Sequence, residues 1–431
     1  MKKILIGAIA FGVMLCSCSE SDGSQNEPNV PGEEESKAYI DVEPLEALQS
    51  WTPTAAEMQG LGALEGFAYN LNEAIIGNYD ELWPQDKTGN YSVSPVSISV
   101  FLSALSQCVD GQAREDLCKM LGLDEADATA LNNKLLRYLS SDMESMQVSI
   151  ANSVWHVEGM PMTEDFKSRM ALQFGAPVNI LDLYSDESVK VLNGWCGDKT
   201  HGMINDIFKE APAMDFILAN ALYFSGSWMN TFAVEKTSKW DFSGTAGSSK
   251  VDMMHNPELI AEYANLNGTE YMSMPFGFGY EMSFIVPASG SDMDEFGKSL
   301  DPAKIDELIA AGKGAELDFR LPRFKDNHQA DIMEILLSLG YPAYDMPTLE
   351  MTGLSSYPLR ANGSKVLHAT ALNVNEKGAE MAAVTIGEWD TWPGDVPEFE
   401  HVEMTIDRPF YYILRNTNCD AVLMIGRVCN L

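Results

Sequence analysis

The sequence Glu376-Lys377-Gly378-Ala379-Glu380-Met381-Ala382-Ala383-Val384-Thr385 has the alternation of a β-strand but the composition of a weak one. From residue 379 to residue 389 every second position is uncharged, whereas Glu380, Glu388 and Asp390 share the opposite parity. This pattern predicts a strand with one buried face. Glycine and alanine make a poor permanent strand, because small side chains pack little and glycine has a high backbone entropy. The segment is thus a candidate for moving between loop and strand. The alternative is an ordinary edge strand that runs into an Ala/Gly loop.

The rest of the chain has the size and composition of a large globular fold. It has 431 residues, of which 45% are hydrophobic, so a sizeable core is expected. Helical and strand-like patterns follow one another without an internal repeat and without a linker after residue 50, which predicts one large α+β domain. The formal net charge of -35 disfavours nucleic acid, heparin-like polyanions and anionic membrane surfaces as partners, because binding them needs clustered Lys and Arg.

Hydrophobic periodicity predicts where the elements lie. Helices are expected to start at Ser94-Pro95 and to cover residues 53–78, 114–121, 125–139, 164–174, 188–207, 292–300, 302–311 and 331–339. Strands are expected at residues 147–157, 216–224, 239–242, 250–254, 259–264, 271–275, 280–286, 315–324, 366–375, 404–414 and 421–428. The second half of the chain is therefore mainly strand.

The N-terminus has the features of an export signal. Met1-Lys2-Lys3 precedes an apolar run over residues 4–15 that is too short for a permanent membrane span. Leu15-Cys16-Ser17-Cys18 resembles a bacterial lipobox, which implies cleavage before Cys18 and acylation of its thiol. The alternative is a plain signal peptide with an incidental cysteine. We therefore divide the chain into a signal peptide at 1–17, a lipidated cysteine with a tether at 18–50, and a folded domain at 51–431.

The tether predicts where the protein resides. Residues 19–37 are polar, acidic and low in aromatics, so they cannot bury a core and are expected to be flexible. An acidic, serine-rich segment directly after a lipidated cysteine resembles the surface-export signals of Bacteroides-type lipoproteins. We expect a secreted lipoprotein anchored to the cell envelope, at the outer membrane or cell surface, that contacts the membrane through its lipid anchor only.

Residue types typical of catalysis and metal binding occur without the usual spacing. Five cysteines remain after residue 18, and their wide spacing fits neither zinc pairs nor a small disulfide scaffold. We expect most of them to be buried small hydrophobes; they are Cys108, Cys118, Cys196, Cys419 and Cys429. The sequence has no G-x-S-x-G, H-E-x-x-H or P-loop motif. We expect no catalytic residue, no metal and no cofactor, so that the protein is not an enzyme.

Six segments in order resemble those of the serpin family, from about residue 55 to the C-terminus. They are Y-S-V-S-P-V-S-I-S at 91–99, N-G-W with T-H-G-M-I at 193–204, L-A-N-A-L-Y-F-S-G-S-W at 218–228, L-P-R-F-K at 321–325, D-R-P-F at 407–410 and M-I-G-R-V at 424–428. The resemblance implies an α+β single domain with a large mixed central sheet, two further sheets and about eight or nine helices. It also implies an exposed reactive-centre loop at about 376–403.

The resemblance assigns the opening segment to the hinge of that loop. The positions that match the family hinge or lie on its inward face are Glu376, Gly378, Ala379, Glu380, Ala382, Ala383 and Thr385. It implies suicide inhibition, in which a peptidase attacks the loop, forms an acyl-enzyme and is trapped when the cut loop inserts into the central sheet. The uncharged alternate positions suit insertion if they face into the sheet, because a buried charge would cost several kcal/mol unless paired.

Further roles carry over from the resemblance. Ser94, Ser97, Asn220 and His368 match the polar cluster where the family's sheet parts, and Trp228 matches the tryptophan at the top of that sheet. A structural histidine and an ordinary core tryptophan are the alternatives. Met381 departs from the family's usual alanine on the inserting face, and such a flexible apolar side chain either packs there or slows insertion.

The cut site is less defined than the hinge. The family's usual spacing leads to Trp392, but Pro393 follows it and disfavours cleavage. The loop is longer than in many relatives, so the cut is expected between 388 and 398, and its candidate positions are Trp389, Thr391, Trp392 and Val396. The loop has no Lys or Arg between Lys377 and Arg408, which favours elastase-, chymotrypsin- or papain-like targets over trypsin-like ones.

Three hypotheses follow from the sequence. The first is an envelope-anchored, monomeric inhibitor of serine peptidases or of cysteine peptidases. The second is a binding protein of the same fold on the cell envelope that no longer inserts its loop. The third is a lipoprotein hydrolase, which rests only on scattered Ser, His and Asp residues.

Overall fold

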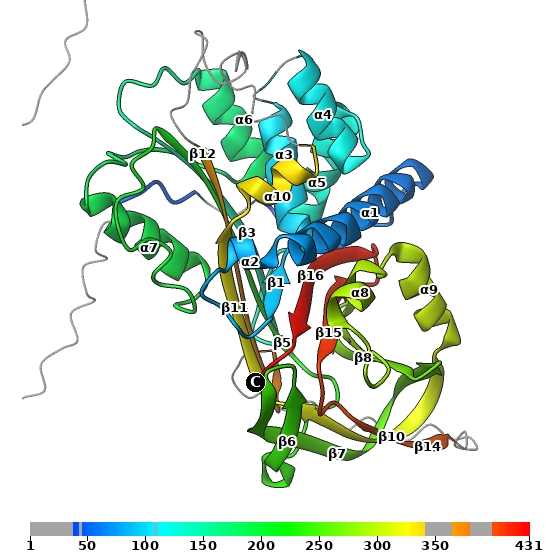
Figure 1. Cartoon of the computed structure of the whole chain (residues 1–431). Coiled ribbons are helices and arrows are strands. Elements are labelled where there is room, and N and C mark those ends of the chain that lie inside the picture. Colours follow the sequence, from blue (N-terminus) through cyan, green and yellow to red (C-terminus); the bar gives the residue numbers. More distant parts are fainter. Residues whose placement is uncertain (1–37, 43–44, 108, 110, 341–363, 380–398) are drawn as a thin grey trace, which may run out of the picture. The chain divides into compact units, whose positions relative to one another are not determined.

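The computed structural model describes residues 38–42, 45–107, 109, 111–340, 364–379 and 399–431 (Figure 1). The described residues belong to one compact unit, Ala38–Leu431. The predicted signal peptide, Cys18, Cys108 and the tether up to residue 37 lie outside the described residues. Among the helices that the structure describes, none has both the length and the apolar character needed to cross a bilayer.

Ten α-helices lie in the described part of the chain, where the sequence predicted eight or nine. They are α1 (Ala55–Gly77), α2 (Tyr79–Leu82), α3 (Pro95–Ser106), α4 (Gly111–Leu121), α5 (Glu125–Leu139), α6 (Glu164–Phe174), α7 (Glu187–Lys199), α8 (Met293–Lys298), α9 (Pro302–Ala311) and α10 (Met333–Ser338). Their start signals are local. Ser94 caps α3 by accepting a hydrogen bond from the backbone N–H of Ser97, and Pro95 occupies the first turn, as predicted.

The helix predicted at 188–207 ends earlier, because its last residues cannot continue a right-handed helix. The structure ends α7 at Lys199. His201 and Gly202 follow with φ values of 51° and 81°, in the left-handed region. The Thr200 hydroxyl accepts a hydrogen bond from the backbone N–H of Ile204 at 3.1 Å, which closes the turn.

The large mixed sheet has seven strands in the order β11-β12-β13-β5-β3-β2, with β4 paired to β3. Its strands are β11 (Phe324–Asp331), β12 (Ser364–Asn375), β13 (Gly378–Ala379), β5 (Phe216–Ser227), β3 (Met146–His156), β2 (Ser141–Met143) and β4 (Val178–Ile180). The pairs β12–β5 and β3–β4 are parallel, and the remaining pairs are antiparallel. The sheet is therefore mixed, as predicted.

A second sheet has nine strands. They are β1 (Tyr91–Val93), β16 (Ala421–Val428), β15 (Phe410–Asn416), β9 (Tyr280–Val286), β8 (Thr269–Gly277), β7 (Gly247–Leu266), β10 (Lys313–Pro322) and β14 (Glu400–Thr405) in that order, with β6 (Ser238–Gly244) paired to β7. The strand β7 pairs with β6, β8 and β10, so the strands expected in two further sheets share one hydrogen-bonded network. Predicted strands 250–254 and 259–264 are both parts of β7, whereas predicted strand 404–414 divides into β14 and β15 around Pro409, which lacks a backbone N–H.

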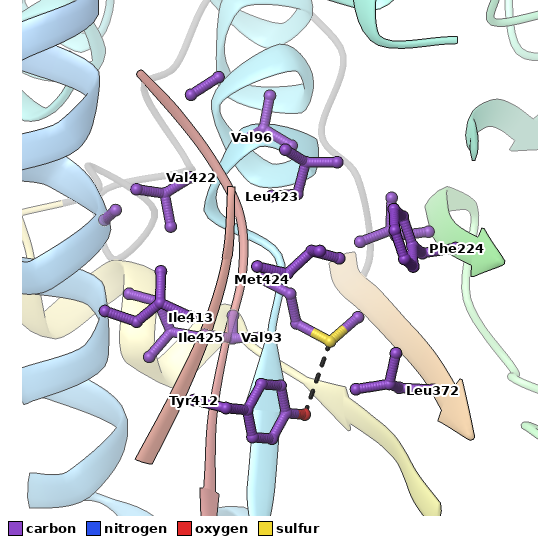
Figure 2. Packing of buried hydrophobic residues seen from close by; sticks show 14 of the residues in the cluster. Val93, Val96, Phe224, Leu372, Tyr412, Ile413, Val422, Leu423, Met424 and Ile425 are labelled. Atoms are coloured by element: carbon purple, nitrogen blue, oxygen red, sulfur yellow. Dashed lines mark hydrogen bonds between the residues drawn. The ribbon is translucent and has the colours of Figure 1, made fainter. Parts of the chain in front are cut away.

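Strand β5 is buried on both faces, which explains its nearly continuous apolar sequence. Phe216, Leu222 and Phe224 belong to the larger core cluster, which joins the two sheets, α1, α3 and α5. Figure 2 shows Phe224 and Leu372 of the seven-stranded sheet near side chains of β15 and β16. Ile217, Ala219 and Ala221 of β5 belong to a smaller cluster that includes residues of α7.

Candidate functional site: a hinge at the mouth of a strand seam

The line between β5 and β12, here called the seam, is closed along most of its length. The two strands pair directly and in parallel from Phe216↔Ser364 to Tyr223↔Ala371. Beyond that point β13 lies between them. Gly378 pairs with Ser227 on one side and Asn375 on the other, and Ala379 pairs with Gly226 and Val374. The first two residues of the predicted inserting strand are thus already in the sheet.

The backbone of Gly378 touches the neighbouring strand so closely that no side chain fits. A Cβ atom built there would lie 1.9 Å from the carbonyl oxygen of Gly226 and 2.8 Å from the Cα of Ser227. Gly226 is crowded as well, since its Cβ would lie 3.0 Å from atoms of Met146 and Phe224. Glycine is therefore needed at position 378 by close approach, not by backbone conformation. Ala379 beyond it is fully buried.

Trp228 anchors the chain just before β13. Its backbone N–H donates to the carbonyl oxygen of Lys377 at 2.8 Å, and its indole Nε1–H donates to that of Asn375 at 3.0 Å. The ring is fully buried and stacks on Phe276, with centroids 4.1 Å apart. Trp228 is consequently a core residue that also lies at the mouth of the seam.

Glu376 holds the hinge by charge. Its carboxylate forms an ion pair with Arg323 and accepts a hydrogen bond from the Thr237 hydroxyl at 2.6 Å. The backbone N–H of Phe232 donates to its carbonyl oxygen at 2.9 Å. Burial alone would raise the pKa of this carboxyl, but the hydrogen bonds from Arg323 and Thr237 outweigh it and hold the pKa below its usual value. Glu376 is therefore ionised at neutral pH.

The structure brings the four polar residues Ser94, Ser97, Asn220 and His368, here called the polar cluster, into direct contact. His368 of β12 lies opposite Asn220 of β5 across the seam. The backbone N–H of Ser94 donates to His368 Nε2 at 2.9 Å, and Nδ1 lies 3.1 Å from Asn220 Oδ1. Ser94 and Ser97 share a hydroxyl hydrogen bond of 2.9 Å, and Asn220 Nδ2 donates to the carbonyl oxygen of Ser97 at 3.4 Å.

These partners define the state of the histidine. Because Nε2 accepts a hydrogen bond from a backbone N–H, the ring proton of His368 lies on Nδ1 and is donated to Asn220. Burial lowers the pKa of His368 to about 3, so the ring is neutral at physiological pH. The cluster thus joins β12, β5 and the start of α3 without any net charge.

Sequence reasoning missed three partners. Asn152 of β3 accepts a hydrogen bond from Asn220 Nδ2 at 2.8 Å and extends the polar cluster. Arg323 and Thr237 bind Glu376. Arg323 belongs to the L-P-R-F-K segment, and its charge opposite to that of Glu376 was an available signal. Thr237 and Asn152 carry no signal that separates them from other polar residues.

The arrangement does not form a hydrolytic centre. The Ser94 hydroxyl is bonded to Ser97 and not to the histidine ring, whose hydrogen-bond partners among the described residues are the backbone N–H of Ser94 and the Asn220 amide. In the same part of the chain, no group of three or more His, Cys, Asp or Glu side chains is placed to hold a metal ion. Burial raises the pKa of the Cys196 and Cys419 thiols to about 12, so both are inert, small apolar side chains.

The predicted hinge positions beyond Ala379, Met381 and all the cut-site candidates lie outside the described residues: Glu380, Met381, Ala382, Ala383, Thr385, Trp389, Thr391, Trp392 and Val396.

Comparison with known proteins identifies the architecture. The family model described as serpin (serine protease inhibitor) matches residues 69–431. Serpin-Z2A of Triticum aestivum is 27% identical over 384 residues, which cover 84% of this chain and 94% of the relative. Heparin cofactor 2 of Rattus norvegicus is 24% identical, with 93% of this chain and 88% of the relative covered.

Solved structures agree in fold. The thermophilic serpin tengpin in its native state has a TM-score of 0.76 at 22% identity and covers 91% of this chain and 100% of its own. Human thyroxine-binding globulin has a TM-score of 0.76 at 21% identity, covering 87% of this chain and 99% of its own. Because the family model spans the seam, the hinge and all six segments that carry the resemblance, the chain belongs to the serpin family.

Proposed function

We propose that this protein is a suicide inhibitor of serine or cysteine peptidases, which traps the acyl-enzyme by inserting its cut loop into the seam. One observation carries the proposal. The hinge already occupies the mouth of the seam with Gly378 and Ala379, while β5 and β12 pair directly below it. A strand that continued from Ala379 would run antiparallel between two strands that lie parallel to each other.

The energetics favour insertion once the loop is cut. Inserting a strand replaces one row of backbone pairs between β5 and β12 with two rows. Some ten further hydrogen bonds at about 1 kcal/mol net each would stabilise the inserted form. The uncut loop is held at both ends, since β13 before it belongs to the seven-stranded sheet and β14 after it belongs to the nine-stranded sheet. Cleavage removes this restraint, so the uncut fold stores the free energy that the trap releases.

The sequence of the loop supports a class of target. After Lys377 it offers acidic, aromatic and small residues but no Lys or Arg, so elastase-, chymotrypsin- and papain-like peptidases fit better than trypsin-like ones. The family description, serine protease inhibitor, supports a peptidase as the partner. The structure of human thyroxine-binding globulin contains thyroxine, so a member of this fold also binds a small molecule. A binding protein that does not insert its loop is the outcome against which the proposal is tested.

The test mixes the protein with elastase, chymotrypsin, papain and trypsin and looks for a covalent complex that survives SDS. We expect a complex with at least one of the first three and a rise in Tm of the cut protein. Ala383→Glu places a charge on the inward parity and should convert the inhibitor into a substrate. Ala382→Glu places the same charge on the outward parity and should leave trapping intact. Cleavage without complex and without a rise in Tm would refute inhibition.

The location of the protein is a separate proposal that rests on the leader alone. We propose that Cys18 is acylated and that the monomeric domain is held at the bacterial envelope, at the outer membrane or cell surface, where it meets foreign peptidases. Labelling of cells with a fatty-acid analogue should mark the wild type but not Cys18→Ser. Equal labelling of both proteins, or none of either, would contradict it.

A further inference from the structure

The inner face of β11 carries ionisable side chains where a buried strand face is usually apolar. Phe324, Asp326 and His328 follow one another on this face at alternate positions. Phe324 packs against the ring of Tyr412 in β15, with centroids 5.6 Å apart, so the face meets the nine-stranded sheet. The side chain of Asp326 is 2% exposed, and a buried carboxylate destabilises a fold strongly unless it is paired. Asp326 therefore needs strong partners.

These partners come from both sheets. The Tyr412 hydroxyl of β15 donates a hydrogen bond to one oxygen of the Asp326 carboxylate. His328 Nε2, on the same strand as Asp326, lies 2.6 Å from the other oxygen. Figure 2 shows the Tyr412 hydroxyl beside the sulfur of Met424, 3.6 Å away, which is a weaker acceptor than a carboxylate. Asp326 thus joins the two sheets, and we call Tyr412, Asp326 and His328 the clamp.

The end of α2 closes over the clamp at the edge of the sheet. Trp83, which follows α2, meets the His328 ring edge-on, with centroids 5.6 Å apart. Its indole N–H donates a hydrogen bond of 3.0 Å to the carbonyl oxygen of Gln329. Because β11 is the outermost strand of the seven-stranded sheet, this bond covers an edge carbonyl. His328 therefore lies between a buried carboxylate and the ring that holds α2 on the sheet.

The charges around His328 favour its protonated form. Burial alone would lower the pKa of His328, but the Asp326 and Asp86 carboxylates outweigh it and raise this pKa above its usual value. Asp326 acts from the same strand, and Asp86 acts from the segment after α2. On the other side, β12 presents the uncharged Thr370 opposite His328. The ring is thus a cation over a wider pH range than in the unfolded chain.

The remaining elements packed on β11 contribute neutral or paired groups. From β1 and β15 these are Tyr91 and Tyr412, and burial raises the pKa of both phenols well above the usual value. Arg427 of β16 has its guanidinium over the Tyr91 ring and forms an ion pair with Asp294. The balance of charge in the clamp therefore depends on the His328 proton.

We propose that the clamp is a proton-operated link between the two sheets, which holds β11 firmly while His328 is a cation and loosens in alkaline solution. A neutral ring can still donate from Nε2, but it no longer balances the charge of Asp326. Hydrogen bonds between ionised groups are about twice as strong as those between neutral ones. The proposal concerns the uncut fold and does not depend on peptidase inhibition.

The sign of the pH dependence follows from linkage. The pKa of His328 is raised in the fold, whereas an unfolded chain releases this proton near pH 6.5. The folded state therefore binds more protons above this pH. The stabilisation by the clamp is complete below about pH 6.5 and is lost as the pH rises through the folded pKa of His328.

Imidazole NMR of the uncut protein tests the charge directly. The chain has 6 histidines, and His328→Gln identifies the signal of His328 by its loss. We expect this signal to titrate above about pH 6.5 in the wild type. It should titrate at a lower pH in Asp326→Asn, which keeps the shape of the side chain but removes its charge. A ring that is already neutral at about pH 6.5 in the wild type, or the same midpoint in both proteins, would overturn the proposal.

Hydrogen exchange tests whether the proton holds the strand. From about pH 6 to about pH 9, we expect the protection factors of the amides of residues 324–331 to fall by about tenfold in the wild type and by less in His328→Gln. The amides of β3 should show no such difference between the two proteins. Lys325→Ala is the matched control, because its side chain is exposed on the opposite face of β11, and it should follow the wild type.

A second variant tests the link from the other sheet. Tyr412→Phe removes the donor to Asp326 but keeps the ring against Phe324, so the protection of β11 should fall by about tenfold at both pH values. Unchanged protection in this variant would mean that Asp326 does not join the sheets. An equal fall with pH in the wild type and His328→Gln would likewise refute the clamp, as would a matching difference in β3, which would indicate a general loss of stability.

Discussion

The mouth of the seam and the polar cluster below it are held by different kinds of contact. At the mouth, an ion pair joins Glu376 to Arg323, whose side chain is 40% exposed. In the cluster, the side chains are neutral and buried, and each bonds to another member or to the backbone. The Glu376 carboxylate is buried, but it is paired with Arg323, which water reaches, since a buried charge costs several kcal/mol unless it is paired. The mouth can therefore exchange its contacts for water, whereas the cluster opens only by leaving buried donors without partners.

The largest expected effect comes from a substitution that prevents the hinge from entering the mouth of the seam. Gly378→Val would place a side chain against the backbone of Gly226, which has no room to move. The hinge should leave the seam, and the cut loop should no longer insert. Most of the stabilisation on cutting, about 10 kcal/mol for ten hydrogen bonds, should then be lost. The measurement is the rise in Tm after proteolysis of the loop.

The matched control is Lys377→Ala, one residue earlier, where the side chain is exposed and the hydrogen bonds to Trp228 and Asn375 come from the backbone. It should keep the full rise in Tm. A normal rise in Gly378→Val would mean that the close approach to Gly226 is not needed for insertion.

A smaller effect is expected when one side chain of the polar cluster is removed by substitution. Asn220→Ala removes the acceptor of the His368 Nδ1–H and the donor to Asn152. Leaving buried polar groups unpaired should lower the free energy of unfolding of the uncut protein by about 2–3 kcal/mol, measured by urea denaturation. Asn152→Ala should cost less, since Asn220 keeps its bonds to His368 and to the Ser97 carbonyl. Equal losses of unfolding free energy in both variants would mean that the hydrogen bond between Asn220 and His368 across the seam contributes no more than the bond to Asn152.

Between pH 7 and pH 5, acidification should reduce the contribution of the polar cluster to the free energy of unfolding, but not the contribution of the ion pair at the mouth. His368 stays neutral in the fold down to a pKa of about 3, whereas an unfolded chain takes up the proton near pH 6.5. The unfolded state thus binds more protons, and stability falls as the pH falls. The loss attributable to His368 should be about 2 kcal/mol at pH 5. Glu376 has a lowered pKa, so its contribution is lost only below the ordinary carboxyl range.

Folding also shifts the pKa values of two other histidines, so the measurement is a difference between two proteins. The Asp326 carboxylate outweighs the effect of burial and raises the pKa of His328, whereas burial lowers the pKa of His156. Urea denaturation of the wild type and His368→Gln at pH 7 and pH 5 cancels these contributions. If both proteins lose the same stability, His368 does not titrate as the structure requires.

The smallest effect is expected at the mouth itself. Glu376→Gln removes the charge but keeps an acceptor for the Thr237 hydroxyl. Because Arg323 is partly exposed, the ion pair is screened by solvent, and the loss should be about 1 kcal/mol or less. The difference from the wild type should shrink further in high salt. A loss as large as that of Asn220→Ala would contradict the contrast between a solvated mouth and a dry cluster.

Local patterns predicted much of the fold. The ranges of α5, α6, α9 and β9 match the predicted ranges, because regular spacing of apolar residues and cap residues depends only on near neighbours. The end of α7 was missed because a left-handed turn at His201 has little sequence signal in a residue other than glycine. The continuity of β7 was missed because its burial pattern is irregular along its 20 residues.

The sequence by itself determined the family segments, the uncharged parity of residues 379–389 and the four members of the polar cluster. The parity follows from the residue types at alternate positions, whereas the segments and the cluster follow from the resemblance to the serpin family. Only the tertiary structure decided that the hinge enters the seam by two residues, that Glu376 meets Arg323 and Thr237 from 53 and 139 positions away, and that Asp326 meets Tyr412 of the other sheet. Contacts between such distant residues depend on how the two sheets pack together, and no local pattern encodes that packing.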